Sequence, residues 1–521
     1  MKSMAVLSLG AVLVAVVGCG SSDDEQWQST GGAGPVALTP PATGDPVPES
    51  VACDGPDGPV FYVSPAGDDG ADGSQGAPWQ TLAKAAAEVQ PGDTVYLMEG
   101  TYAEPLIPVT SGTAGAVITF AGDPAGGPAI IDGTGVAIEG RGLVDLAGIS
   151  HLRLCNLTVR SSAEHGVAVN DTWETPTSHV ALLELTVEDS GDAALYVEDA
   201  THVVIERNHT RESVSSGIGV WYSQQVAVRD NEVVNARNND DHGDQEWISI
   251  ASVADFEVSG NELYQDNPDF DGHSAIDVKE SSHRGSVHHN YIHDFNRSGQ
   301  IYIDAWEAGF EGTYSLSWID VYANLLVDAK GITVGSEQGG TAENIRIFNN
   351  VIVRSLSSGV LLSETGHSSG GNGPRRNIHI FNNTIYECRN HGTSGIYVVT
   401  NRVENIVIQN NIVMLDPERV VGLITAGHSA AVEHLTVDHN LVFGPTECSN
   451  DYPNCVEVSG GPDNLSADPR FVDADGLDLM LLADSPAIDQ GLAIDGLVDD
   501  YAGDSRPEGA GVDIGAYEHS P

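Results

Sequence analysis

A lysine near the middle of the sequence is accompanied by carboxylates, and this combination could carry out acid–base chemistry. Lys279 is one of four lysines among the 521 residues. The acidic residues that could act with it are Glu246, Asp277, Asp304 and Glu337. A lysine can act as a general base when burial or a nearby cation lowers its pKa. Two carboxyl groups can instead supply a general acid and a nucleophile. These five residues are therefore the catalytic candidates.

Two acidic turns precede Lys279, at 238–244 and 266–273. The first contains Asp240, Asp241 and Asp244 in a D-D-x-x-D spacing. Ca2+ takes six to eight oxygen ligands, which closely spaced carboxylates on a flexible turn can supply. We expect these three aspartates to hold Ca2+, with Glu280 as a further ligand. The alternative is that both turns are solvated acidic loops.

The candidates lie within a repeated pattern of short strands. Segments of the form apolar-x-x-Asn-x-apolar recur, mostly 23 to 34 residues apart, and the segment 182–187 has Glu184 in place of Asn. The repeated asparagines are Asn156, Asn208, Asn231, Asn261, Asn290, Asn324, Asn350, Asn383, Asn411 and Asn440. Between them runs a second strand type, usually opened by a small residue, as at 217–220 and 331–334. Both types alternate apolar and variable residues, which is the strand period of two.

This period predicts a coiled solenoid, because one repeat cannot bury its own inner face but stacked repeats can. The repeated asparagines would hydrogen-bond along the stack. Leucine-rich repeats would need leucines at fixed positions, and a propeller would need four strands per repeat. The predicted fold is all-β, a right-handed parallel β-helix of roughly eleven or twelve coils over 59–465, with a short capping helix over 82–89.

Aligning the second strand type repeat by repeat predicts which side chains share the outer face. One outward column reads Ala168, Tyr196, Gly219, Ser249, Asp277, Tyr302, Thr333, Leu361 and Tyr397. The next column reads Asn170, Glu198, Trp221, Ala251, Lys279, Asp304, Gly335 and Ser363. The alignment places Asp277, Lys279 and Asp304 side by side. The alternative is a surface ladder in which Lys279 pairs with Asp304 and contributes less than about 1 kcal/mol.

The charge balance excludes one large class of partner. The sequence has 75 acidic residues against 22 lysines and arginines, a net charge of −53. A nucleic-acid-binding protein needs a basic surface to neutralise phosphates, so we expect no nucleic-acid partner. The acidic excess is suited to binding divalent cations. Hydrophobic residues make up 40% of the sequence, which is enough for a substantial core.

The two ends of the chain are expected to lie outside the β-helix. Residues 1–18 have a short charged start and an apolar core typical of a signal peptide. They end at Val-Val-Gly-Cys, which resembles a bacterial lipobox, and this resemblance implies lipidation of Cys19 and an outer-membrane or cell-surface location. No other apolar run is long enough to span a bilayer. Residues 19–58 form a polar tether, and 466–521 form a C-terminal closing segment.

The cysteines outside the lipobox suit an exported protein, in which disulfides can form. Cys448 and Cys455 bracket a short loop and are the predicted pair. Cys53, Cys155 and Cys388 cannot be assigned from the sequence. No pair of cysteines has the spacing of a zinc site.

Segments at both ends of the predicted solenoid resemble known β-helix proteins. The segments 61–65, 73–85, 91–95 and 100–102 resemble the N-terminal cap and first coil of the pectate-lyase and chondroitinase B type. The segments 468–473, 485–489 and 513–518 resemble the closing segment of the bacterial surface proteins called choice-of-anchor Q. The resemblance covers about 60–518 and implies a β-helix at the cell surface.

The D-D-x-x-D turn, followed one coil later by Lys279, is similar to the calcium-and-lysine pectate lyases. This resemblance implies that Ca2+ and a lysine base cleave a uronate-containing polysaccharide by β-elimination. We expect a monomer that is held to the membrane only by its N-terminal lipid. One aspartate that this family supplies a coil earlier is missing, because 215–217 reads Ser-Ser-Gly. Asp304 also opposes the base role, since a neighbouring anion keeps Lys279 protonated.

Two other functions remain open. The Asp304 segment and the Glu337 segment resemble β-helix xylosidases, which implies a retaining glycoside hydrolase with two carboxyl groups about 5 Å apart. In either enzyme, the aromatic residues Trp247, Tyr302 and Trp306 would stack on sugar rings. The remaining alternative is a non-catalytic glycan-binding protein or adhesin, in which Lys279, Asp304 and Glu337 could be replaced without consequence.

Overall fold

The structure is a computed structural model. It describes the residues 44–53, 58–172, 174–236, 246–267, 274–306, 315–336, 339–364, 372–389, 393–415, 420–427, 429–444, 448 and 455–520. The predictions for the signal peptide, for Cys19 and for most of the tether lie outside these residues. The same holds for Asp240, Asp241, Asp244 and Glu337.

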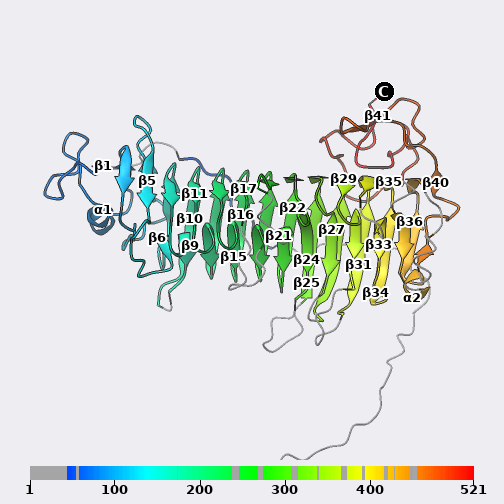
Figure 1. Ribbon diagram of the computed structural model, residues 1–521, viewed down its shortest axis with the longest axis horizontal. Coiled ribbons are helices and arrows are strands. Elements are labelled where there is room, and N and C mark those ends of the chain that lie inside the picture. The colour runs from blue at the N-terminus through cyan, green and yellow to red at the C-terminus, as the bar shows by residue number, and fades with distance from the viewer. Residues whose placement is uncertain are drawn as a thin grey trace, which may run out of the picture. The chain divides into compact units, whose positions relative to one another are not determined.

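Short strands stack into three long sheets, here named by their first strand (Figure 1). The β1 sheet contains β1 (Val60–Val63), β2 (Thr94–Leu97), β4 (Ile118–Gly122), β7 (Leu152–Cys155), β10 (Thr177–Leu183), β13 (Ala200–Glu206), β16 (Gln224–Arg229), β19 (Ala254–Ser259), β22 (His283–His288), β25 (Ser315–Tyr322), β28 (Thr341–Phe348), β31 (Arg375–Phe381), β34 (Val403–Gln409) and β37 (Leu435–Asp438). The β3 sheet contains β3 (Gly100–Tyr102), β5 (Ala129–Asp132), β8 (Thr158–Arg160), β11 (Thr186–Glu188), β14 (His209–Arg211), β17 (Glu232–Val234), β20 (Glu262–Tyr264), β23 (Tyr291–His293), β26 (Leu325–Val327), β29 (Val351–Ser355), β32 (Thr384–Cys388), β35 (Ile412–Met414), β38 (Leu441–Phe443) and β40 (Leu465–Ser466). The β6 sheet contains β6 (Gly142–Asp145), β9 (His165–Asn170), β12 (Leu195–Glu198), β15 (Ile218–Trp221), β18 (Ile248–Ala251), β21 (Ser274–Lys279), β24 (Gln300–Asp304), β27 (Ile332–Gly335), β30 (Val360–Leu362), β33 (Thr393–Val398), β36 (Val420–Ala426) and β39 (Val456–Glu457).

Each repeat contributes one strand to each sheet in turn, and neighbouring repeats pair in parallel. Within the described residues, the complete three-strand coils run from β4, β5 and β6 to β34, β35 and β36, which makes eleven. The antiparallel β39 ends the β6 sheet. The fold is a right-handed parallel β-helix, as predicted. It arises because inward side chains of successive coils form one continuous apolar core, from Val63 to Val442.

The predicted asparagine ladder forms at the turn between the β1 and β3 sheets. From Asn208 onward, each side-chain Nδ2 donates to the Oδ1 of the asparagine one coil later at 2.9 to 3.0 Å, ending at Asn464. Asn156 and Glu184 do not belong to this ladder. Strand register aligns Asn156 and Glu184 with Arg207, the residue before the ladder residue Asn208. Asn156, Glu184 and Arg207 all have the left-handed backbone conformation of this turn.

Smaller elements complete the two ends. The predicted capping helix is α1 (Leu82–Glu88), and the Thr81 side chain caps it by accepting from the Lys84 amide at 3.1 Å. A second short helix is α2 (Ser429–Val432). No helix within the described part of the chain is long and apolar enough to cross a membrane.

The C-terminal segment folds back along the solenoid. It contains the antiparallel pair β41 (Phe471–Asp473) and β42 (Asp478–Leu481). Its apolar side chains pack on the outer face of the β3 sheet, for example Leu479 in one cluster with Val351. The turn residue Asn382 donates to the carbonyls of Asp513 and Gly515 at 3.0 and 3.1 Å. Figure 1 shows this segment beside β29 and β35.

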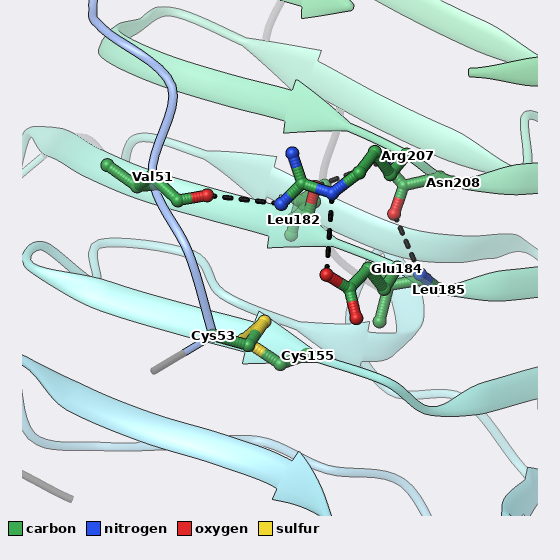
Figure 2. Close-up of a disulfide and its surroundings, with 8 residues drawn as sticks. All are labelled: Val51, Cys53, Cys155, Leu182, Glu184, Leu185, Arg207 and Asn208. Atoms are coloured by element: carbon green, nitrogen blue, oxygen red, sulfur yellow. Dashed lines mark hydrogen bonds and ion pairs between the residues drawn. A yellow bond between two sulfur atoms is a disulfide. The ribbon is translucent and has the colours of Figure 1, made fainter. Parts of the chain in front are cut away.

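Two disulfides hold outlying segments. The predicted Cys448–Cys455 bond is present. Cys53 bonds to Cys155 and fixes residues 44–53, the N-terminal strap, across the β1 sheet (Figure 2). Arg207 donates to the Val51 carbonyl at 3.2 Å, and Figure 2 shows its guanidinium between Val51 and Glu184. Cys388 is buried and free.

Candidate functional site

Strand register confirms the two predicted outward columns. Ser249 pairs with Asp277, and Asp277 pairs with Tyr302 in the next coil. In the neighbouring column, Lys279 pairs with Asp304. The strands β21 and β24 therefore bring Asp277, Lys279 and Asp304 together on the outer face of the β6 sheet.

The centre of the site is an ion pair between Lys279 and Glu246. Lys279 Nζ donates to Glu246 Oε2 at 2.6 Å, and Ser249 Oγ donates to the same oxygen at 3.0 Å. The side chains of Lys279 and Glu246 are 18% and 7% exposed. Asp277 and Asp304 are each 3% exposed. The lysine is thus buried among carboxylates, which differs from the exposed Lys279–Asp304 ladder considered as the alternative.

The charges in this cluster shift one another's protonation. Burial raises the pKa of Asp277 well above its usual value, and the nearby Glu246 carboxylate raises it further, while Lys279 opposes this shift. Burial alone would lower the pKa of Lys279, but the carboxylates of Glu246, Asp277 and Asp304 together raise it. The arrangement therefore favours a charged lysine and a protonated Asp277. Asp277 Oδ1 is buried and has no hydrogen-bond partner within the described residues.

The next coil extends the cluster toward a buried arginine. Tyr302 lies beside Gly335, where a Cβ atom would come within 2.3 Å of its hydroxyl. Arg375 is fully buried, and burial lowers its pKa to about 10, although Tyr302 and Asp304 oppose the shift. Its guanidinium donates to the Ser363 carbonyl at 2.5 Å. A side chain at Gly335 would therefore displace the tyrosine from the edge of the site.

The three aromatic residues predicted to stack on sugar rings differ in how exposed they are. Trp247 is fully buried and packs on Phe295 at 4.7 Å between ring centroids, so its predicted contact with sugar is wrong. Its position just before β18 carries it into the solenoid. Tyr302 is buried as well, at 6% exposure. Trp306 follows β24 and is half-buried, which leaves it as the aromatic candidate with accessible surface.

Of the four residues predicted to bind metal, Glu280 lies within the described residues, so the predicted site stays a prediction. Glu280 follows β21 and accepts from Ser252, after the end of β18, whereas Glu246 lies before the start of β18. Glu280 is thus separated from Glu246 by the length of that strand. Asp240, Asp241 and Asp244 lie outside the described residues. Within the described ranges, no group of three or more side chains has the geometry to hold a metal ion.

Sequence analysis did not single out a second polar group on the same face. Arg141, in the turn before β6, donates to the Tyr196 hydroxyl at 2.7 Å and forms an ion pair with Glu198. Tyr196 and Glu198 appear in the predicted columns, but Arg141 lies outside any strand. The sequence carries no signal that joins it to residues two coils later.

A pocket on a different sheet offers a cavity away from these charges. It has a volume of about 300 Å³ and is bounded by the N-terminal strap and by His151, His179 and His202 of the β1 sheet. These imidazoles stack at 4.5 and 4.2 Å between centroids. The pocket contains none of the catalytic candidates. The ionisable residues of the β6 sheet remain the candidate site, because groups with perturbed pKa values are candidates for function.

Comparison with known proteins shows the same fold. Residues 61–251 match the model of the Pel9A-like right-handed β-helix region. The chain is 25% identical over 479 residues to the uncharacterized protein YwoF of Bacillus subtilis strain 168, covering 82% of this chain and 92% of that protein. The structure of the PL6-family alginate lyase AlyGC is similar with a TM-score of 0.53 and 14% identity, covering 83% of this chain and 56% of that chain. The pectate lyase Pel9A is similar with a TM-score of 0.46 and 14% identity, covering 89% and 96%.

Proposed function

We propose that this protein is a Ca2+-dependent lyase that cleaves a uronate-containing polysaccharide by β-elimination. The observation that carries the proposal is Lys279, a lysine buried among carboxylates on the outer face of the β6 sheet. It lies one coil after the D-D-x-x-D turn at 240–244. The stretch matched by the Pel9A-like model ends at 251, at the end of β18, the strand that pairs with β21.

β-Elimination needs a base that removes the proton from C5 of the uronate while the bond between C4 and the glycosidic oxygen breaks. The electrons of the broken C–H bond form the new double bond, and the leaving oxygen takes up a proton. Lys279 is the proposed base, and it first gives its extra proton to Glu246, whose carboxylate lies 2.6 Å from Nζ. The neutral amine then takes the C5 proton, and the leaving oxygen takes its proton from water.

The carboxylates that raise the pKa of Lys279 must be offset before it can act as a base. Ca2+ at Asp240, Asp241 and Asp244 would reduce this negative charge and would pair with the uronate carboxylate. The chemistry of these ligands fits the ion, since all are hard carboxylate oxygens. This would also allow a protein of net charge −53 to bind a polyanion.

A glycoside hydrolase is the second candidate, and the charge on Lys279 favours it. A protonated lysine next to Asp304 keeps that carboxyl ionised, which a nucleophile requires. Glu337 would be the acid/base partner. This candidate needs no neutral lysine, whereas the lyase does, so the two make opposite demands on Lys279.

One assay separates the candidates. The mature protein is incubated with a panel of acidic and neutral polysaccharides, with Ca2+ or with EDTA, and both the ultraviolet absorbance of unsaturated products and new reducing ends are followed. We expect Ca2+-dependent absorbance that is lost in Lys279→Arg. Arginine preserves the cation beside Glu246, but its pKa is too high to yield a base. Lys84→Arg is the matched control, because Lys84 forms an exposed ion pair with Glu88 on α1.

The other outcomes are equally informative. Reducing ends without absorbance, lost in Asp304→Asn and retained in Lys279→Arg, would establish a hydrolase and refute the lyase. Glycan binding without either signal would indicate a non-catalytic binding protein. Far-ultraviolet circular dichroism of each variant shows whether the β-helix is intact.

A further inference from the structure

A group of aromatic and basic side chains surrounds Tyr196 on the same sheet face as Lys279. Tyr196 is on β12, three strands from β21, which carries Lys279. The imidazole of His165 stacks on Tyr196 with 4.0 Å between centroids and 7° between planes. Trp221 packs on the other side of Tyr196 at 5.1 Å. These residues belong to the consecutive strands β9, β12 and β15. Strands are spaced by about 4.8 Å, so β12 lies about 14 Å from β21 along the sheet.

The position of the tryptophan depends on a glycine. A Cβ atom at Gly219 would lie 2.0 Å from Cη2 of Trp221, so the indole occupies space that any side chain there would fill. Trp221 and Tyr196 are both half-buried, which leaves part of each ring at the surface. Aromatic rings of this kind bind the apolar faces of sugars.

Arg141 provides a positive charge beside these rings. Its guanidinium carbon lies 5.4 Å from the Tyr196 centroid, and Nη1 contacts both the Tyr196 hydroxyl and the Glu198 carboxylate. These contacts hold the guanidinium in one orientation. The side chain is nevertheless 48% exposed, and Nε and Nη2 have no hydrogen-bond partner within the described residues.

Arg141 differs from an arginine whose whole guanidinium is taken up by an ion pair, because its Nε and Nη2 atoms stay available to a ligand. A guanidinium presents two parallel N–H groups along the Nε–Nη2 edge, and this edge matches the two oxygens of a carboxylate. Because Nη1 is already held, binding on that edge would require little further ordering of the side chain.

We propose that Arg141, His165, Tyr196 and Trp221 form a glycan subsite in which the sugar packs against the rings and its carboxylate binds the Nε–Nη2 edge of Arg141. The ligand class is an acidic polysaccharide that extends along the β6 sheet from Lys279 toward β6. The choice of a uronate rests on the proposed lyase function. The subsite itself rests on the Arg141 geometry and does not require catalysis.

Binding is measured by calorimetry on the full mature chain carrying Lys279→Arg, in the presence of Ca2+, so that turnover does not interfere. The probes are oligogalacturonate and oligoalginate, each compared with its methyl ester, which lacks the negative charge. We expect Arg141→Ala to weaken binding of the acid form about 10- to 100-fold, the range for a hydrogen bond to a charged group. Binding of the ester should change little. Trp221→Ala should weaken both forms.

Arg346→Ala is the matched control. Arg346 also forms an ion pair, with Asp320, and lies 5.5 Å from the Phe348 ring, but on the β1 sheet. The Arg346→Ala variant should bind both probes as tightly as the Lys279→Arg protein in which it is made. Unchanged acid binding in Arg141→Ala, an equal loss for acid and ester, or no binding of either acid by the parent would overturn the subsite. Turnover assayed separately in the wild type tests the lyase, so that proposal can fail while the subsite stands.

Discussion

The buried ion pair makes a quantitative prediction about stability. In Lys279→Met the buried Glu246 carboxylate loses the ammonium that lies 2.6 Å from it. Removing one partner of a buried ion pair typically costs about 3–5 kcal/mol. We expect a loss of this size in the free energy of unfolding at neutral pH. Glu246→Gln should cost less, because Lys279 keeps Asp277 and Asp304 as neighbours.

The double variant Lys279→Met/Glu246→Gln tests whether the loss comes from unpaired charge. It should be more stable than Lys279→Met alone, because residue 246 then carries no buried charge that lacks its lysine partner. Lys84→Met, which breaks the exposed pair with Glu88, should stay close to the wild type. The measurement is guanidinium denaturation followed by tryptophan fluorescence and circular dichroism.

The loss in the free energy of unfolding of Lys279→Met should change with pH in one direction. Burial raises the pKa of Asp277 and Lys279 opposes this shift, so removing Lys279 raises that pKa further and the folded variant binds more protons than the folded wild type. The deficit of Lys279→Met should therefore grow as the pH rises. In the wild type, the raised pKa of Lys279 means that its contribution is fully present below its unfolded pKa of about 10.4. It is lost as the pH rises through the folded-state pKa. A stable Lys279→Met, or a deficit that does not change with pH, would refute the reasoning.

Two further predictions concern the scaffold. Replacing both cysteines of Cys53–Cys155 by serine opens a loop with a sequence separation of 102, against 7 for Cys448–Cys455. Chain entropy predicts losses of about 4.7 and about 2.4 kcal/mol in denaturation experiments, and a larger loss for the short loop would contradict that account. Asn324→Ala should destabilise by about 1–3 kcal/mol for each buried group left without a partner, because Asn324 bonds to Asn290 and Asn350. Asn464→Ala, at the end of the ladder, should cost less, and equal losses would argue against a continuous ladder.

The repeats made the fold and the outward columns predictable. A period of two along each strand separates inward from outward residues, so aligning repeats aligned Asp277 with Ser249 and Tyr302 as the structure does. Alignment of the repeats gave a wrong result where the asparagine lies one residue before the ladder position. Asn156 resembles a ladder residue in sequence, but it occupies the preceding turn position, and Leu157 takes the ladder position.

Contacts between distant segments could not be predicted. The Cys53–Cys155 bond joins the strap to β7, and nothing in the spacing favours Cys155 over Cys388. Trp247 was misplaced because it lies next to a strand, where one residue of offset decides between the solvent and the core. Arg141 was missed because it reaches across two coils from a turn.

The buried charges themselves are an argument for function. The solenoid needs its outer columns only to be compatible with a strand, and other coils fill the same positions with Gly219, Thr333 or Leu361. The strands β21 and β24, with Glu246 just before β18, instead bury carboxylates around a lysine, and these groups must be desolvated without any gain in apolar packing. A sequence under selection for stability alone would replace such a cluster with apolar residues of similar size. Departures from local rules of this kind are expected at functional sites, because chemistry at a substrate requires groups that stability does not. Under the proposed function, apolar substitutions in this cluster should remove activity even where the β-helix stays folded.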